Sequence, residues 1–311
     1  MIRFDEHKGA FIKHCPCTPG VIPCGYYNLN LHTGCPYRCS YCILQAYLET
    51  PEPVYFSNIE DMEQELAEVS RTQPYLRMGT GELSDSLAFD PQAGYSQKIL
   101  SIFERFPKVV FEFKTKSTHI DPILEYKASH RTELKNIVIS WSLNPEAIIR
   151  REENLTPDLS RRLRAIQAAQ AHGLAVGIHF DPLIYVKEWK RAYAALIDAL
   201  STILDPGRIA WWSLGALRFP HALRDHIFKH RDSCLFEGEL VKGHDGKYRY
   251  FKPLRQELFH VVARQIRRSV SRDVPLYLCM EDRDMWQDIL PEISPEESVV
   301  NRYLYESVFK S

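Results

Sequence analysis

The sequence has almost no net charge and no long apolar run, and both absences limit what the protein can be. Its 39 Lys and Arg residues nearly balance 40 Asp and Glu residues, which gives a formal net charge of −1 at pH 7. A polyanion such as DNA could therefore be held only by a local basic patch. No stretch reaches the roughly 18 apolar residues of a membrane span. Residues 1–25 carry charges and cysteines where a signal peptide has its apolar run, so we expect a cytoplasmic protein with no membrane partner.

The sequence also lacks internal repeats, low-complexity tracts and Gly/Ser-rich linkers. Short apolar runs alternate with segments of 3.6-residue periodicity, which is typical of βαβ units and of a parallel sheet covered by helices. We therefore predict an α/β fold with one open, incomplete (β/α)6 barrel. Its six strands, with a possible seventh at 274–279, are expected at residues 27–31, 75–78, 109–114, 136–141, 174–180 and 209–214.

The helices between these strands are predicted from apolar residues that recur on one face. One helix should begin after Thr156-Pro157-Asp158 and end at Gly173, because Pro suits a first helical turn and Gly the position past the end. Two segments stand outside the alternation. We predict an N-terminal extension at 1–26 and a barrel domain at 27–311, with a C-terminal extension and a hairpin insertion at about 236–252. The expected helical stripes are Met62, Leu66 and Val69; Leu159, Leu163 and Ile166; and Trp189, Tyr193, Leu196 and Leu200.

Cysteines are crowded near the N-terminus. The chain has eight, at positions 15, 17, 24, 35, 39, 42, 234 and 279. Disulfides are a poor explanation for this crowding, because the chain is long, has no export signal and has no cysteine between Cys42 and Cys234. Metal or iron–sulfur ligation is the better interpretation.

Cys35, Cys39 and Cys42 form a C-x3-C-x2-C motif in the loop after the first predicted strand. Three thiolates can hold three irons of a [4Fe–4S] cluster and leave the fourth iron open to a substrate or cosubstrate. This motif resembles that of the radical S-adenosylmethionine superfamily. The resemblance implies that the open iron binds the methionyl amine and carboxylate, and that one electron releases a 5′-deoxyadenosyl radical. The alternative is a zinc site that combines two of these cysteines with two from Cys15, Cys17 or Cys24.

Polar or glycine residues follow the later predicted strands, where barrel enzymes place their active sites. They could hold a cofactor, and a lysine among them could pair with a carboxylate. For each group taken singly a turn or a solvated side chain remains an open alternative. The groups are Gly79-Thr80-Gly81-Glu82, Thr115-Lys116, Ser142-Leu143-Asn144 and His179-Phe180-Asp181.

From residue 26 to about 281 the chain resembles the spore photoproduct lyase family of radical enzymes, more closely its wide group of lyase-like proteins than the lyase itself. The resemblance implies that Tyr41 contacts the adenine, Lys116 the carboxylate and Ser142 the ribose region of S-adenosylmethionine. Gly79, Gly81 and Glu82 resemble the superfamily's segment that contacts the methionyl amine, and Asn144, His179 and Asp181 could bond the ribose or orient substrate. The segments that carry the resemblance are 35–48 (CPYRCSYCILQAYL), Thr115-Lys116, Ser142-Leu143-Asn144, 179–184, Arg218-Phe219 and 246–254 (GKYRYFKPL).

The chain departs from the lyases at two positions. True lyases have a cysteine shortly after the second strand that donates hydrogen to the thymine radical, whereas this region reads Gly81-Glu82-Leu83-Ser84-Asp85-Ser86. The tyrosine that follows the third cluster cysteine in those lyases is Ile43 here. A carboxylate does not replace a thiol as a hydrogen-atom donor. Glu82 could instead hold cosubstrate or act as a base, so Glu82 and Tyr41 are the catalytic candidates.

Two further segments could carry function. Cys15, Cys17 and Cys24, with Cys279 of the last predicted strand, could hold an auxiliary iron–sulfur cluster, although buried free thiols would account for them equally simply. A hairpin around Asp245-Gly246 mixes cations with aromatic residues, which favours nucleic acid, while a surface hairpin or a substrate lid remains open. The residues of this mixture are Lys242, Lys247, Tyr248, Arg249, Tyr250 and Lys252.

The sequence thus predicts a radical S-adenosylmethionine enzyme reduced by a protein such as flavodoxin or ferredoxin. By analogy with the family, its substrate would be a nucleic-acid base or nucleoside. A small biosynthetic metabolite is one alternative. A non-catalytic, metal-stabilised module that binds nucleic acid is the other.

Overall fold

The computed structural model describes residues 2–48, 52–228 and 233–310. Residues 1, 49–51, 229–232 and 311 fall inside the predicted domain ranges but lie outside this description. The division into an extension and a barrel domain stays a prediction.

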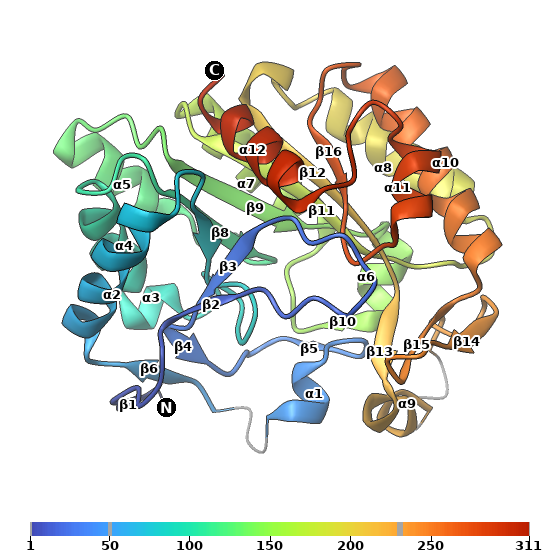
Figure 1. The fold of residues 1–311 in the computed structure, drawn as a ribbon, viewed down its shortest axis with the longest axis horizontal. Helices are drawn as coiled ribbons and strands as arrows, with labels where there is room; N and C mark the ends of the chain where they lie inside the picture. The colour runs from blue at the N-terminus through green and yellow to red at the C-terminus, as the bar shows by residue number, and fades with distance from the viewer. Residues whose placement is uncertain (1, 49–51, 229–232, 311) are drawn as a thin grey trace.

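One curved eight-stranded sheet forms the centre of the molecule (Figure 1). The strand order is β16-β12-β11-β9-β8-β7-β3-β2, and every neighbouring pair is parallel except β2 and β3. The two edge strands do not pair with each other, so the sheet is the open half-barrel that the sequence predicted. The strands are β2 Ile12–His14, β3 Tyr26–Leu29, β7 Arg77–Gly79, β8 Val110–Thr115, β9 Ile137–Ser142, β11 Ala175–Leu183, β12 Ile209–Ala216 and β16 Leu276–Leu278.

All seven predicted strands are confirmed. The central strands form because their residues are β-branched or aromatic and are buried on both faces, as in β9, where every residue is buried. Strands β11 and β12 run past their predicted ends to Leu183 and Ala216. This extension places Asp181 on strand backbone, although the sequence predicted the strand to end one residue before it.

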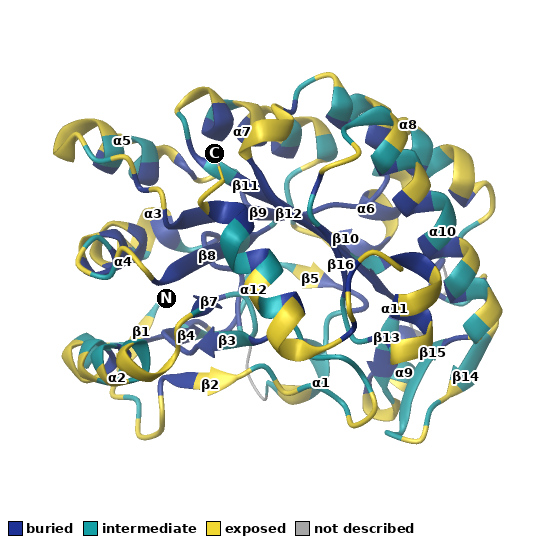
Figure 2. Ribbon diagram, turned by 45° about the horizontal axis from the view of Figure 1, so that its top comes forward, coloured by how far each residue is buried: buried dark blue, intermediate teal, exposed yellow. Residues whose placement is uncertain are grey.

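Helices cover the outer face of the sheet, and their exposed residues point away from it (Figure 2). The predicted helix before β11 is confirmed: the Asp158 side chain accepts a hydrogen bond from the Arg161 amide, and Gly173 follows the helix with a φ of 79°. The longer helices are α2 Ile59–Thr72, α4 Tyr95–Phe103, α5 Asp121–His130, α7 Leu159–Ala171, α8 Trp189–Ser201, α9 His221–Phe228, α10 Lys252–Ser269 and α12 Glu297–Val308. The shorter ones are α1 Leu44–Tyr47, α3 Asp90–Ala93, α6 Glu146–Glu152, α11 Arg283–Ile289 and the 3-10 turn Pro206–Arg208.

Three small sheets surround the half-barrel. They contain β1-β6-β4, β10-β5 and β13-β15-β14, and the second of them joins the cysteine motif to the segment after α6. The hairpin predicted near residue 245 is confirmed as β14 and β15. The strands are β1 Arg3–Asp5, β4 His32–Thr33, β5 Arg38–Cys39, β6 Val54–Phe56, β10 Glu153–Asn154, β13 Arg218–Pro220, β14 Leu240–Lys242 and β15 Lys247–Tyr250.

Strand β2 lies in the predicted N-terminal extension but pairs antiparallel with β3, so this part of the extension belongs to the main sheet. Within the described ranges, no helix combines the length and the apolar character needed to cross a membrane.

Candidate active site

A cavity of about 360 Å³ opens at the carboxyl ends of the parallel strands. This volume lies at the small end of the range for ligand sites. Its wall includes five of the predicted site residues, Tyr41, Gly81, Glu82, His179 and Asp181, together with Cys42. Residues of the cysteine motif and residues at the strand ends thus line one cavity.

The other predicted contacts lie around this wall. A Cβ at Gly79 would overlap the Tyr26 hydroxyl and the Glu112 carbonyl oxygen, so only glycine fits there. The Lys116 amine lies 5.7 Å from the centre of the Tyr41 ring. Ser142 is buried and Asn144 faces Glu153. On β8 the cavity is lined instead by Glu112 and Lys114, two residues apart and hence on one face of the strand.

The cysteine motif brings three thiols together. Cys39 is buried in β5, and the Cys42 amide donates to the Cys39 carbonyl at 3.0 Å. Burial raises the pKa of each of the three thiols, to about 12 for Cys35. Cys35 and Cys42 lie near enough to Cys39 to raise its pKa further, whereas the Lys116 ammonium lowers the pKa of Cys39 and Cys42. Because a thiolate is the metal ligand, this cation favours ligation.

Residues 2–48, 52–228 and 233–310 contain no group of three or more His, Cys, Asp and Glu side chains that could hold one metal ion. A [4Fe–4S] cluster makes a different demand, because each thiolate binds a separate iron. Three grouped thiols beside a lysine, with Cys42 open to the cavity, fit that demand.

Glu153 is the buried anion that organises the motif. Its Oε1 accepts hydrogen bonds from the Tyr41 hydroxyl at 2.6 Å and from the Asn144 amide at 3.0 Å, and Arg162 lies 2.7 Å from Oε2. Burial alone would raise the pKa of Glu153, but Lys116, Arg162 and these donors lower it. Three of the predicted site residues, Tyr41, Asn144 and Lys116, therefore interact with one carboxylate. The sequence analysis missed Glu153 because it stands in no motif.

The neighbouring Glu152 joins the cysteine motif to the segment that begins at Ser233. Its carboxylate accepts hydrogen bonds from the Ser40 hydroxyl, from Ser233 and from the Cys234 amide. The β10–β5 pairing sets Glu153 opposite Cys39. Both glutamates thus hold the motif loop against the end of the barrel.

Glu112 forms a second buried network in the cavity wall. It accepts hydrogen bonds from the Tyr26 hydroxyl at 2.6 Å, from His179 Nε2 at 2.8 Å and from Trp211 Nε1 at 3.2 Å. Burial alone would raise the pKa of Glu112, but His179 and the surrounding donors lower it to about 2. Among the described residues, His179 Nδ1 has no hydrogen-bond partner. Since Nε2 faces Glu112, Nδ1 remains available to a bound molecule.

Glu112→Gln should destabilise the fold near neutral pH and lose this effect in acid. The pKa of Glu112 is lowered from 4.5 to about 2, so its carboxylate contributes stability that is fully present above about pH 4.5 and is lost as the pH falls towards about 2. We expect a cost on the order of 3 kcal/mol near pH 7, shrinking below pH 4.5. Urea unfolding at about pH 7 and about pH 3.5 measures both values.

The matched control is Glu82→Gln in the same cavity. Burial raises the pKa of Glu82, so neutralising it should not destabilise the fold at pH 7. An equal loss of stability in Glu112→Gln at both pH values would contradict the prediction, because it would indicate lost packing rather than lost charge.

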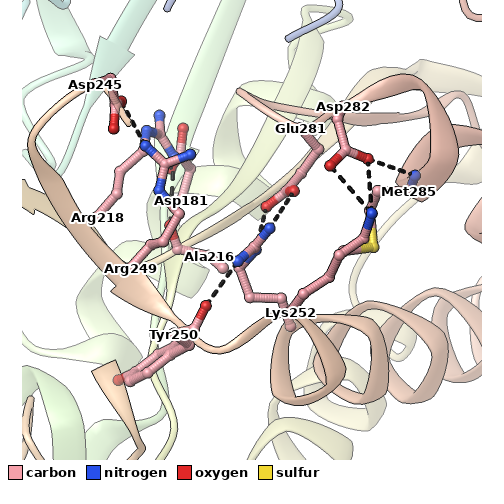
Figure 3. Close-up of polar contacts among 11 residues, drawn as sticks. Asp181, Ala216, Arg218, Asp245, Arg249, Tyr250, Lys252, Glu281, Asp282 and Met285 are labelled. Carbon is pink, nitrogen blue, oxygen red and sulfur yellow. Dashed lines mark hydrogen bonds and ion pairs between the residues drawn. The ribbon is translucent and has the colours of Figure 1, made fainter. Parts of the chain in front are cut away.

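Asp181 lies beside Arg218 at 3.3 Å (Figure 3). Although burial acts in the opposite direction, Arg218 and Lys114 lower the pKa of Asp181, which is therefore a carboxylate. The cavity thus combines cations from β8 and β13 with the anions Glu112 and Asp181.

The hairpin differs from its predicted role as an open patch of cations and aromatics. Tyr250 is fully buried, so its inclusion among residues that could stack on a base is wrong. Arg249 pairs with Asp245, and Lys252 lies 3.2 Å from Asp282 (Figure 3). Lys247, by contrast, lines the cavity.

Comparison with known proteins identifies the family. The family model for spore photoproduct lyase matches residues 20–252, which is most of the chain and includes the cysteine motif. The chain belongs to the spore photoproduct lyase family. It is thereby a member of the radical S-adenosylmethionine superfamily, and both predictions are confirmed.

The curated relatives of this spore photoproduct lyase family member are distant. The chain is 22% identical over 210 residues to the spore photoproduct lyase of Clostridium acetobutylicum and 23% identical over 185 residues to that of Bacillus subtilis. These matches cover 67% and 58% of this chain, but only 61% and 53% of the two relatives. The chain thus spans little more than half the length of the curated relatives.

Solved structures of spore photoproduct lyase share the fold. One, complexed with dinucleoside spore photoproduct, superposes with a TM-score of 0.76 at 20% identity, covering 89% of this chain and 82% of that chain. A mutant with bound AdoMet and dinucleoside spore photoproduct gives a TM-score of 0.72 at 20% identity, covering 89% and 81%. The predicted half-barrel is therefore confirmed.

Proposed function

We propose that this chain is a radical S-adenosylmethionine enzyme that acts on a nucleic-acid base or nucleoside. The observation that carries the proposal is the group of three thiols, Cys35, Cys39 and Cys42, near the Lys116 ammonium, with Cys42 in the wall of a cavity that charged side chains also line. Family membership and the lyase structure with bound AdoMet support it.

Cys35, Cys39 and Cys42 would hold the [4Fe–4S] cluster. When bound, the cluster and S-adenosylmethionine supply a 5′-deoxyadenosyl radical. The protein's own residues then have simpler tasks. Glu153 fixes the Tyr41 hydroxyl and with it the orientation of the ring that faces the cavity. Because the Tyr41 ring is apolar, it offers a stacking surface for the adenine.

The polar walls would bind and orient the remaining groups. Lys114 supplies a cation to a carboxylate or phosphate, while Glu82 is placed to accept hydrogen bonds from an ammonium group. His179 Nδ1 would accept or hold a proton at a fixed position, because Glu112 orients the ring through Nε2. The roles of Lys116, Ser142 and Asn144 are then to position this wall.

The nucleic-acid substrate rests on the relatives, since two lyase structures hold a dinucleoside spore photoproduct. One observation favours a small metabolite instead. Arg249 and Lys252 are paired with carboxylates and Tyr250 is buried, which leaves less of the hairpin for a phosphate backbone. The absent hydrogen-donor cysteine also separates this chain from the lyase reaction.

The test is an anaerobic assay of the full chain, reconstituted with iron and sulfide and reduced with dithionite in place of a flavodoxin or ferredoxin. We expect 5′-deoxyadenosine to form, and its yield to rise when dinucleoside spore photoproduct is added. Matched reactions without dithionite should form none. Cleavage that no nucleic-acid substrate stimulates would favour the small metabolite, and bound zinc without cleavage would overturn the proposal.

A further inference from the structure

Four cysteines outside the motif lie in or beside the wall of the same cavity. Cys15, Cys24 and Cys279 line its wall, as Cys42 does. The Cys15 thiol is hydrogen-bonded to Cys17, and the Cys17 amide donates to the Cys15 carbonyl at 2.8 Å. Cys17 also interacts electrostatically with Cys24 and Cys279. Cys42 of the motif and three of these four cysteines therefore line one cavity, although Cys279 is far from the others in the sequence.

Backbone contacts hold the N-terminal cysteines in this position. The Cys15 amide donates to the Tyr26 carbonyl at 2.9 Å, which continues the β2–β3 ladder. The Ile22 amide donates to the Glu281 carbonyl at 2.9 Å, and Val21 forms a bridge with Asp282. The segment 15–24 is thus fixed at one end to β3 and at the other to the residues that follow Cys279.

Side chains hold Cys279 equally firmly. Arg218 donates to Cys279 Sγ at 3.4 Å while its guanidinium also contacts Asp181. Two residues further on, Glu281 accepts hydrogen bonds from Arg255 at 2.9 and 3.2 Å, so the segment that follows β16 is tied to α10. A site with ligands on two such supports is preorganised.

Three cations lie near the four thiols, alongside the carboxylates of Glu82 and Asp181. Arg77 donates to the Cys24 carbonyl, Arg218 contacts Cys279, and Lys114 lines the cavity beside them. A cubane cluster held by four thiolates carries a net negative charge, and buried cations offset that charge.

We propose that Cys15, Cys17, Cys24 and Cys279 hold a second iron–sulfur cluster on the wall of the cavity. Four thiolates occupy all four irons of a cubane, so this cluster has no open iron for substrate and can only exchange electrons. The inference concerns residues outside the radical S-adenosylmethionine motif, and it goes beyond the proposed function.

The experiment compares anaerobically reconstituted full-length proteins by iron and sulfide content and by electron paramagnetic resonance after reduction. One triple variant carries Cys35→Ala, Cys39→Ala and Cys42→Ala, and the other carries Cys15→Ala, Cys17→Ala and Cys24→Ala. Cys279→Ser leaves the N-terminal segment intact, so it tests the same site even if the second triple variant misfolds. Cys234→Ala removes a buried cysteine outside both groups and serves as the control.

We expect about eight irons in the wild type and in the control, and about four in each triple variant. The spectrum that remains in the first triple variant should not change when S-adenosylmethionine is added, because no iron is open. Cys279→Ser should lose or alter that same spectrum. About four irons in the wild type, unchanged in the second triple variant and in Cys279→Ser, would overturn the inference, as would zinc or a Cys15–Cys17 disulfide in place of iron.

Cleavage of S-adenosylmethionine is scored separately. About eight irons without 5′-deoxyadenosine would overturn the proposed function and support the second cluster. About four irons with cleavage would support the proposed function and overturn the second cluster.

Discussion

Cys39→Ala should abolish the formation of 5′-deoxyadenosine and remove the cluster bound by the motif. Cys39 is the buried one of the three proposed ligands, and its β5 backbone is paired with β10. Two remaining thiolates cannot hold three irons of a cubane, so no open iron is presented to S-adenosylmethionine. Iron content and 5′-deoxyadenosine after dithionite reduction measure the loss.

Cys234→Ala is the matched control for this variant, because Cys234 is also a buried cysteine and alanine keeps the backbone amide that donates to Glu152, losing only the contact between the thiol and that carboxylate. It should keep both iron and cleavage. Retention of full cleavage in Cys39→Ala would refute the ligand assignment. A loss in both variants would indicate general damage to the core, which circular dichroism would detect.

Glu153→Ala should be among the most destabilising single substitutions in the barrel. Glu153 and Arg162 are both fully buried and lie 2.7 Å apart, so removing the carboxylate leaves an uncompensated buried guanidinium. Breaking such a pair typically costs about 3–5 kcal/mol. The Tyr41 hydroxyl and the Asn144 amide lose their acceptor as well. Denaturant unfolding gives the free energy, and iron retention reports on the motif loop.

Glu257→Ala provides the comparison, since Glu257 pairs with Lys190 on the surface, where both side chains are largely exposed. Exposed ion pairs contribute little, so this variant should unfold close to the wild type. If Glu153→Ala were no less stable than Glu257→Ala, the buried network would not hold the motif loop.

The sequence predicted the strands well because each is a short run of β-branched and aromatic residues between recognisable helices. The assignment of Cys35, Cys39 and Cys42 as cluster ligands stays a prediction, which rests on their close spacing, because closely spaced thiols are typical of metal or cluster ligation. The sequence analysis missed Glu153 and Arg162, since a buried ion pair between separate elements leaves no periodic signal. Glu112 and Lys114 did leave a signal in the sequence, because two charged residues on one face of an otherwise apolar strand indicate a cavity lined by charged groups.

Lys116 shows a different limit of sequence reasoning. A lysine just past a strand suggests a ligand contact, and this contact stays a prediction. What the sequence did not indicate is that the Lys116 amine lies against Tyr41 and influences Cys39 electrostatically. The direction of a long side chain after a strand depends on the neighbouring loops, and here those are the β5–β10 pair.

Helix α12 closes the end of the half-barrel opposite the cavity. Asn301 bonds the Tyr75 carbonyl and Arg77 at the start of β7, and Ser307 bonds the Ala210 carbonyl at the start of β12. A double helix is too wide to enter a cavity of about 360 Å³ that is covered from behind. If the substrate base belongs to duplex DNA, it must rotate out of its stack into the mouth, so lesions that already weaken pairing would be engaged most readily.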